Sequence, residues 1–357
     1  MIQHLAHPLH SHLGRTVGLF RLFRWFRWFR SDLYWSIPAL TALLLLILIG
    51  PPVAAQPVGK PVRIVLGFAP GAVADTVARV VAERIRGSYA PVILVDNRPG
   101  AAGRTAVELM KSAEPDGSQI LFSPSGMLVV APHLMRRLPY DPLNDFMPVM
   151  GAARTTFALT IGPLVPPSVR SLTDLARWAR ENPKLASFGA PGPGSGPQFL
   201  GLSLLRELGL TLDYIPYKGM GPVAQDLLGE RLAVGMLTVV DAQAQMKAGR
   251  LRVMATTGAS RSRFLPEVPT AAEAGLRGIE ADEWFGLFLP AKTAPEVVER
   301  LHAALREGLN QAEVRERLAQ VGAETMISPT TEFRQFVRND HERWGRLIRA
   351  SGYKPED

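Results

Sequence analysis

The amino-acid sequence predicts an α/β protein with two lobes, each a mainly parallel β-sheet flanked by helices. Three observations favour this fold class. The chain has 357 residues, more than the ~100–200 of a typical single domain. Short apolar strands alternate with helical patterns along it, and glycine-rich loops follow several of these strands. Alternation of strands and helices is typical of parallel sheets, so a two-lobed arrangement of such units is expected.

Residues 1–55 are expected to lie outside this fold. Five arginines and an apolar run from Ile37 to Ile49 precede the small residues Val53, Ala54 and Ala55. This order is typical of a secretory signal peptide, here cut after Ala55. The apolar run with its flanks approaches the ~20 residues that a membrane span needs, so an uncleaved anchor remains the alternative.

Composition excludes several classes of function. The absence of cysteine excludes disulfides, thiolate catalysis and cysteine-ligated metals. Without the five arginines and one aspartate of residues 1–55, the net charge falls from +8 to +4. The remaining charges are interspersed, which argues against a nucleic-acid partner. His133, His302 and His341 are far apart in the sequence and none lies at metal-ligand spacing from another, so they are interpreted as surface or packing residues, and no metal site and no cofactor are predicted.

The first strand, Val62–Leu66, is expected to lead through a loop into a helix. Phe68, Ala69, Gly71 and Ala72 lie in the loop, and apolar residues then recur with helical spacing. Unpaired backbone N–H groups at the start of such a helix favour an anion. Asp75 is interpreted either as a residue that stabilises this helix end or as a ligand contact.

Similar loops are expected at the ends of later strands. Ser123, Ser125 and Gly126 follow a third strand at Ile120–Phe122, and Gly194 and Ser195 follow a strand at Leu185–Gly189. Backbone N–H and hydroxyl groups in such loops suit non-covalent binding. Two segments are expected to cross between the lobes, near Thr155–Ile161 and Asp282–Leu287. Ser171 with Asp174 and Thr293 with Glu296 match the capping-box pattern of a helix start.

Motifs that would indicate an enzyme are incomplete. The G-x-G-x-x-A sequence from Gly219 lacks an acidic residue about twenty positions later. Ser195 lies between glycines, but Pro193 and Pro197 occupy the glycine positions of a nucleophile elbow. We therefore predict no catalytic residue, with a secreted α/β hydrolase as the weaker alternative.

Several segments together resemble one family. PVRIVLGFAPGAVADTVAR, NRPGAAG, LPYDP, YKG and VPTAAEAG are similar to signatures of the Bug receptors, the periplasmic substrate-binding proteins of tripartite tricarboxylate transporters. The resemblance extends from Pro61 to the C-terminus. It implies a two-lobed type II periplasmic binding protein fold with two hinge crossings. Lobe 1 would contain residues 56–157 and 283–357, and lobe 2 residues 158–282.

The resemblance also implies a function. A monomeric, non-enzymatic receptor in the periplasm would close on a small carboxylate and deliver it to the membrane subunits of the transporter. Presentation of the ligand to a membrane sensor is the alternative role. The implied ligand contacts are Phe68, Ala69, Gly71, Ala72, Asp75, Ser123, Ser125 and Gly126 in lobe 1, and Gly194, Ser195 and Thr238 in lobe 2.

This chain departs from the family pattern at positions that usually carry polar side chains. The residues found there are Met127, Leu128, Ala131, Gln198 and Leu237. Because these changes favour less polar side chains, the ligand is expected to be a carboxylate with an apolar or aromatic body. Citrate and amino acids are not expected.

Overall fold

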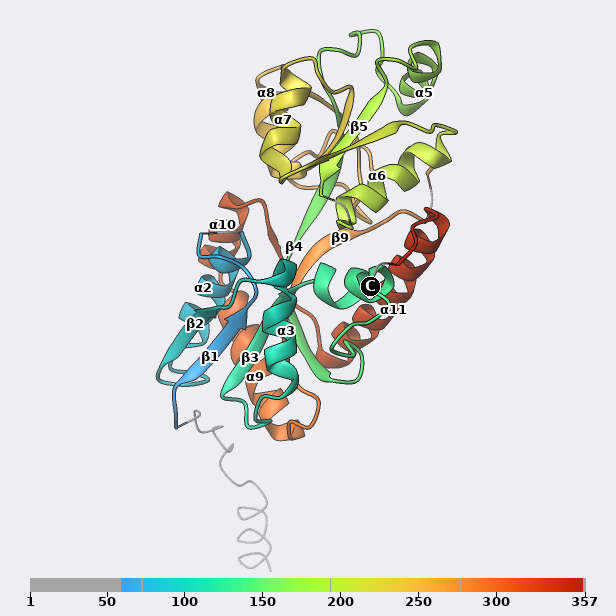
Figure 1. Ribbon diagram of the computed structural model, residues 1–357. Coiled ribbons are helices and arrows are strands. Elements are labelled where there is room, and N and C mark those ends of the chain that lie inside the picture. The colour runs from blue at the N-terminus through green and yellow to red at the C-terminus, as the bar shows by residue number, and fades with distance from the viewer. Residues whose placement is uncertain (1–58, 72, 193, 277, 356–357) are drawn as a thin grey trace, which may run out of the picture. The chain divides into compact units, whose positions relative to one another are not determined.

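The computed structural model describes residues 59–71, 73–192, 194–276 and 278–355 (Figure 1). The predicted signal peptide and its alternative, an uncleaved anchor, lie outside the described residues. Gln56–Asp357 forms one compact unit. Among the residues that the structure describes, no helix combines the length and apolarity that a membrane crossing requires.

Strands and helices alternate through most of this unit, as predicted. The strands are β1 (Val62–Leu66), β2 (Ile93–Asn97), β3 (Gln119–Pro124), β4 (Phe146–Ile161), β5 (Ser187–Pro191), β6 (Asp213–Tyr217), β7 (Val234–Thr238), β8 (Arg252–Thr256), β9 (Asp282–Pro290) and β10 (Glu324–Thr325). The helices are α2 (Val73–Ile85), η1 (Ala101–Gly103), α3 (Arg104–Lys111), η2 (Gly126–Val130), α4 (Ala131–Leu134), α5 (Leu172–Glu181), α6 (Gly196–Glu207), α7 (Met220–Leu228), α8 (Val239–Lys247), α9 (Pro295–Leu309), α10 (Ala312–Gln320) and α11 (Thr330–Ala350).

The sheet contains two parallel groups of strands. β1 pairs in parallel with β2 and β3, and β5 pairs in parallel with β6 and β7. β9 and β4 lie between these groups in the order β2-β1-β3-β9-β4-β7-β5-β6, and their pairings are antiparallel. The predicted α/β class is confirmed, and the sheet as a whole is mixed because of these two central strands.

β4 is long enough to belong to both groups (Figure 1). It pairs with β9 up to Thr156, which lies opposite Asp282, and from Phe157 onward it pairs with β7. Its last residues also pair with β8. The two segments that were expected to cross between lobes are therefore extended, and each lies within a continuous strand.

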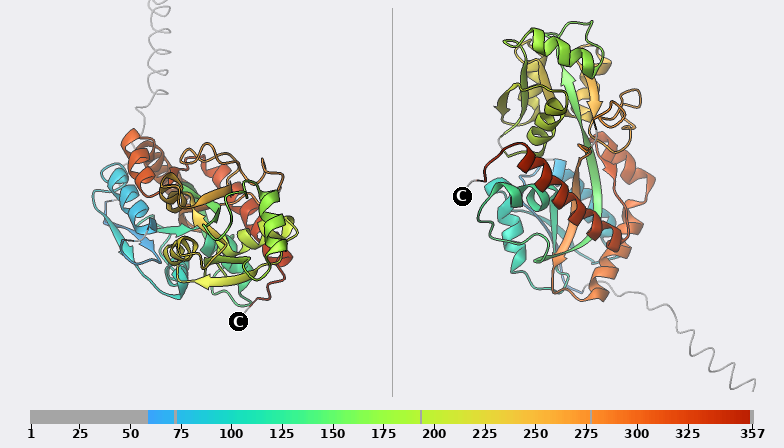
Figure 2. Two further views of the ribbon diagram at one scale, coloured as in Figure 1. Left: turned by 90° about the horizontal axis from the view of Figure 1, so that it is seen from above. Right: turned by 90° about the vertical axis from the view of Figure 1, so that its right-hand side faces the viewer.

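The long C-terminal helix α11 packs against this central part of the sheet. In the right-hand view of Figure 2, α11 lies alongside β4, and the two elements are in contact. Its buried Phe333 stacks edge-to-face on Trp284 of β9, with ring centroids 5.6 Å apart. Apolar and aromatic side chains of this helix thus belong to the core, because side chains at helical spacing share one face.

The two expected capping boxes have different outcomes. Ser171 caps α5 and exchanges hydrogen bonds with Asp174, as predicted. The prediction of a capping box at Thr293 and Glu296 is wrong. α9 begins at Pro295 with Ala294 as its N-cap, and no side chain caps this helix. The Thr293 hydroxyl instead donates to the carbonyl oxygen of Pro290. Proline at the first helical position sets this start, since its fixed φ suits the helix and it has no N–H to cap.

Thr257 joins the two crossing strands. Its buried Oγ1 accepts a hydrogen bond from the backbone N–H of Phe157 at 3.2 Å and donates to the carbonyl oxygen of Ala281 at 2.7 Å. Its backbone N–H also donates to the Phe157 carbonyl oxygen. Thr257 therefore connects the segment after β8 to β4 and to the residue just before β9.

Thr257→Val should lower the free energy of unfolding by about 1–3 kcal/mol, because the isosteric side chain leaves a buried donor and a buried acceptor without partners. Urea unfolding measures this change. Thr173→Val is the matched control, since Thr173 is exposed on α5. Equal stability of the two variants would contradict a structural role for the Thr257 hydroxyl.

Candidate functional site

The loop after β1 is held in place by Asp75. This buried carboxylate accepts hydrogen bonds from the Gly71 N–H, Arg79 Nε and Asn97 Nδ2, each at 2.9 Å. Burial by itself would raise the pKa of Asp75, but these hydrogen bonds outweigh it and lower the pKa below the usual value. Asn97 donates in addition to the carbonyl oxygen of Phe68. Asp75 was interpreted either as stabilising the helix end or as contacting a ligand, and these contacts agree with the first interpretation.

The glycine-rich turn after β2 lies directly against this loop. A Cβ atom on Gly67 would lie 2.3 Å from the Gly103 carbonyl oxygen, so the two backbones touch. Gly103 itself has φ 99° and packs under the ring of Phe68. Only glycine adopts this conformation without strain and leaves this space. The turn therefore positions Phe68 and starts α3 at Arg104.

The loop after β3 is buried. The Ser123 hydroxyl donates to the Pro124 carbonyl oxygen, and the Ser125 hydroxyl donates to Glu283 Oε1 at 2.8 Å. Both serines are at most 1% exposed. The hydroxyl groups of Ser123, at the end of β3, and of Ser125, in the loop after it, are therefore directed to the protein itself, and Gly126 begins η2.

The loop after β5 is likewise held by its own hydrogen bonds. Ser195 is the N-cap of α6, and its hydroxyl donates to the Pro191 carbonyl oxygen at 2.6 Å. The Gly194 N–H donates to Gln198 Oε1 at 2.8 Å. The backbone N–H of Gly194, which was expected to contact a ligand, is thus bound to the Gln198 side chain.

A cleft of about 570 Å³ lies between these loops. Both parallel strand groups contribute to it, through the segments after β1 and β3 and through the start of α6. Most of its lining is apolar and includes Phe68, Val73, Val130, Leu134, Met135 and Phe285. The cleft is therefore shaped for a ligand with a substantial apolar body.

The cleft brings together four of the residues proposed from the sequence: Phe68, Gly126, Gly194 and Ser195. Six others do not line it: Ala69, Gly71, Asp75, Ser123, Ser125 and Thr238. Thr238 caps α8, with its Oγ1 accepting from the Asp241 N–H. Ala72 lies outside the described residues. Met127 and Ala131, two of the less polar replacements, do line the cleft.

Sequence reasoning missed the two charged residues that line the cleft, Arg104 and Glu283. Arg104 directly follows the NRPGAAG motif, and Glu283 lies within the predicted crossing segment Asp282–Leu287, so each belongs to or adjoins a segment named from the sequence. Within the described residues, neither side chain forms an ion pair, and the Arg104 guanidinium forms no hydrogen bond. Burial raises the pKa of Glu283 to about 7, despite the hydrogen bond from Ser125.

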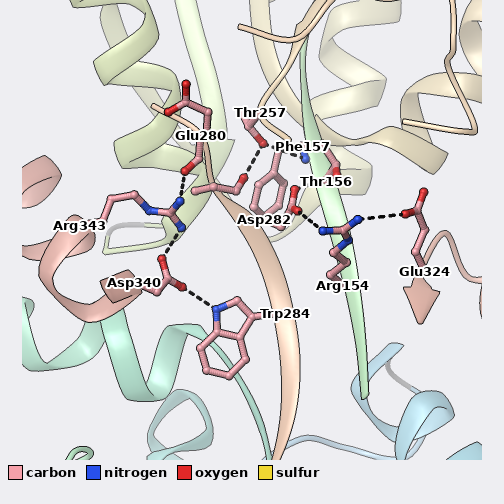
Figure 3. A network of polar contacts seen from close by, with 11 residues as sticks. Arg154, Thr156, Phe157, Thr257, Glu280, Asp282, Trp284, Glu324, Asp340 and Arg343 are labelled. Carbon is pink, nitrogen blue, oxygen red and sulfur yellow. Dashed lines mark hydrogen bonds and ion pairs between the residues drawn. The ribbon is translucent and has the colours of Figure 1, made fainter. Parts of the chain in front are cut away.

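A polar network connects α11 with the start of β9 (Figure 3). Asp340 of α11, only 2% exposed, accepts a hydrogen bond from Trp284 Nε1 at 2.5 Å and pairs with Arg343. Arg343 also donates to the carbonyl oxygen of Glu280, just before β9. The network fixes α11 to the crossing strand that carries Glu283.

Two histidines that are far apart in the sequence lie side by side in the structure. The rings of His133 and His341 are 4.4 Å apart, and His133 Nε2 lies 2.9 Å from the His341 carbonyl oxygen. Folding packs α4 against α11, which sequence separation does not reveal. No group of three or more possible metal ligands occurs among the residues that the structure describes.

An α/β fold with two strand groups, strands that cross between them and a cleft lined from both defines a solute-binding protein of the periplasmic type. The profile of the tripartite tricarboxylate transporter family receptor matches residues 77–353, and the chain belongs to this family. It is a Bug-type periplasmic solute receptor, as the sequence motifs predicted.

Individual relatives agree with this assignment. The UPF0065 protein in the tcbD-tcbE intergenic region of Pseudomonas sp. strain P51 is 33% identical over 290 residues, which cover 81% of this chain and 85% of that protein. Protein BugT of Bordetella pertussis is 30% identical over 296 residues, which cover 83% of this chain and 90% of that protein. Both similarities extend over more than four fifths of this chain and of the relative.

Two solved structures are similar over most of their length. An R. palustris protein solved with adipate has a TM-score of 0.70 and 28% identity, covering 86% of this chain and 100% of that one. MatC from Rhodopseudomonas palustris, with bound malate, has a TM-score of 0.66 and 28% identity, and the match covers 81% of this chain and 98% of that one. The fold prediction is thereby confirmed.

Proposed function

We propose that this receptor binds a small carboxylate with an apolar or aromatic body in the cleft between its two strand groups. The observation that carries the proposal is Arg104, a cation that lines a largely apolar cleft and has no counterion among the residues that the structure describes. A guanidinium group presents paired N–H donors that match a carboxylate. The adipate of one similar structure is a carboxylate with an apolar body, whereas the malate of another carries a hydroxyl group.

The apolar lining of the cleft supports the proposal that the ligand has an apolar or aromatic body. A ligand body placed against Phe68, Leu134 and Phe285 would gain roughly 25 cal/mol for each Å² of apolar area removed from water. A polar group without a partner in the same place would cost about 1–3 kcal/mol. The cleft therefore favours an apolar body over a polyhydroxylated or polycarboxylated one.

Binding would be accompanied by hinge closure. The change of β4 partners between Thr156 and Phe157 supports lobes composed of residues 56–157 with 283–357 and of 158–282. Rotation at the crossings would move Gly194 and Ser195 relative to Phe68 and Gly126. A ligand that contacts both sets stabilises the closed form, because it has more contacts there.

The family assignment supports the wider role. A monomeric receptor, secreted after removal of residues 1–55, would deliver its ligand to the membrane subunits of a tripartite tricarboxylate transporter. Presentation to a membrane sensor uses the same cleft and remains the alternative. Deletion of the gene separates the two roles: it should abolish uptake of the carboxylate, whereas a sensor would alter expression and leave uptake intact.

Thermal unfolding with a ligand panel tests the binding proposal. The full chain is expressed with its own N-terminal segment, purified, and heated with benzoate, phenylacetate, adipate, malate, citrate or benzamide. A ligand at 100 times its Kd adds about 2.7 kcal/mol to the free energy of unfolding. Stabilisation by benzoate, phenylacetate or adipate but not by benzamide is expected. Stronger stabilisation by citrate or malate, or by none of the carboxylates, would contradict the proposal.

Arg104→Gln should weaken binding of benzoate and phenylacetate by about tenfold or more, since loss of a charge-assisted hydrogen bond costs about 1.5–3 kcal/mol. Isothermal titration calorimetry measures the affinity. Arg86→Gln is the matched control, because Arg86 is exposed on the turn after α2 and does not line the cleft. Equal affinities of the two variants would place the ligand carboxylate elsewhere.

A further inference from the structure

Glu283 is an acidic side chain in a cleft proposed for an anion. It lies near the start of β9, lines the cleft and accepts a hydrogen bond from the buried Ser125 hydroxyl at 2.8 Å. No Lys, Arg or His of the described residues forms an ion pair with it. A carboxylate in this position would repel an anionic ligand, and it cannot donate a hydrogen bond to one.

The surroundings of Glu283 favour its neutral form near neutral pH. Burial raises its pKa to about 7, hydrogen bonds from the Ser125–Gly126 loop oppose this rise, and the negative charge of Asp340 adds to it. Asp340 on α11 acts on Glu283 electrostatically, and Arg104 on α3 and Tyr353 after α11 line the same cleft. His341 and Arg343 flank Asp340 on α11, His133 on α4 packs against His341, and Asp282 precedes Glu283 on β9. Arg343 is paired with Asp340 rather than with Glu283.

Building on the proposed function, we propose that Glu283 couples ligand binding to the uptake of one proton. A protonated Glu283 carboxyl would face the bound anion and donate a hydrogen bond to it, with the proton taken from solvent. Arg104 would supply the positive charge and Glu283 the neutral donor. Removal of the proton would leave a carboxylate that repels the ligand, so release is favoured where the pH is higher.

The expected pH dependence follows from proton linkage. Below the pKa of free Glu283, the proton is already present and the affinity is constant. Above it, every binding event must take up a proton, so the affinity falls by about tenfold for each unit of pH. Glu283→Gln keeps a neutral side chain that can donate a hydrogen bond at every pH, and its affinity should not change between pH 6 and 9.

Calorimetric titration of the full-length, purified protein with phenylacetate from pH 6 to 9 tests this proposal. Titration in buffers of different ionisation enthalpy should give uptake of nearly one proton at pH 8.5 for the wild type and none for Glu283→Gln. At pH 8.5 the variant should bind phenylacetate about tenfold or more tightly than the wild type does. Glu342→Gln is the charge-matched control, because Glu342 is exposed on α11 outside the cleft. Phenylmethanesulfonate, which stays ionised throughout, excludes protonation of the ligand as the cause.

The proposal and the proposed function fail in different ways. If neither phenylacetate nor any other carboxylate of the panel stabilises the protein at any pH, the carboxylate-binding function is overturned, and proton coupling with it. If phenylacetate binds with the same affinity from pH 6 to 9, only the role of Glu283 is overturned. A pH dependence that persists unchanged in Glu283→Gln likewise overturns it.

The protonation of Glu283 can also be measured in the protein without a ligand. Because the pKa of Glu283 is raised in the folded protein, its contribution to stability is fully present below the pKa of the unfolded chain and is lost as pH rises through about 7. The Tm of the wild type relative to Glu283→Gln should therefore fall between pH 5 and 8. A difference in Tm that does not vary with pH would contradict the proposal.

Discussion

Gly67→Ala should destabilise the protein by roughly 3 kcal/mol or more and abolish ligand binding in the protein that still folds. The added Cβ would lie 2.3 Å from the Gly103 carbonyl oxygen and 2.4 Å from its Cα. Both are backbone atoms, so no side-chain rotation relieves the overlap, and overpacking of this kind forces the chain to shift. The shift would separate the loop after β1 from the turn that positions Phe68 and Arg104.

Urea unfolding and the ligand panel together measure this effect. Gly221→Ala is the matched control, since a Cβ there meets no atom within 4 Å and the residue is helical in α7. Alanine at that position should be neutral or slightly stabilising, because it favours a helix more than glycine does. Equal stabilities of Gly67→Ala and Gly221→Ala would show that the two backbones do not touch.

Asp340→Ala should lower the free energy of unfolding by about 3 kcal/mol. The substitution leaves the buried Trp284 N–H without its acceptor and Arg343 without its carboxylate, and removal of one partner from a buried charged pair is strongly destabilising. Because α11 would lose one of its attachments to β9, ligand affinity should fall as well. Asp213→Ala, at an exposed position on β6, is the control and should change stability little.

The pH dependence of this effect has a defined sign. Burial raises the pKa of Asp340, although Arg343 and Trp284 oppose the rise. A group whose pKa is raised by folding contributes most stability when it is protonated, and that contribution is lost as pH rises above the unfolded value near 3.8. The stability difference between wild type and Asp340→Ala should therefore be larger at pH 4 than at pH 7. The opposite trend would mean that pairing with Arg343 outweighs burial.

Local patterns in the sequence were sufficient for most of the fold. The run Val62–Leu66 and the helical spacing after it form β1 and α2, and the Ser171 capping box forms as expected. Such features depend on neighbours within a few residues, so the sequence specifies them directly. The capping box at Thr293 was wrong because Pro295 fixed the helix start at a different residue.

The site was predicted less completely than the fold. Sequence reasoning placed Phe68, Gly126, Gly194 and Ser195 in the binding loops, and these residues line the cleft. It could not reveal that the Gly71 and Gly194 N–H groups donate to Asp75 and Gln198. Whether a polar group is free for a ligand depends on which other groups approach it, and this is decided only when distant segments pack together.

The sequence by itself determined the α/β class, the family and the loops in which binding was expected, because each is recorded in short contiguous patterns. Only the tertiary structure decided that Arg104 and Glu283 would line one cleft, with no counterion among the described residues, and that Asp340 would be buried on α11. Arg104 is far from Glu283 and Asp340 along the chain. Charge pairing and burial act through space, so folding alone determines which charged groups are paired and which remain for a ligand.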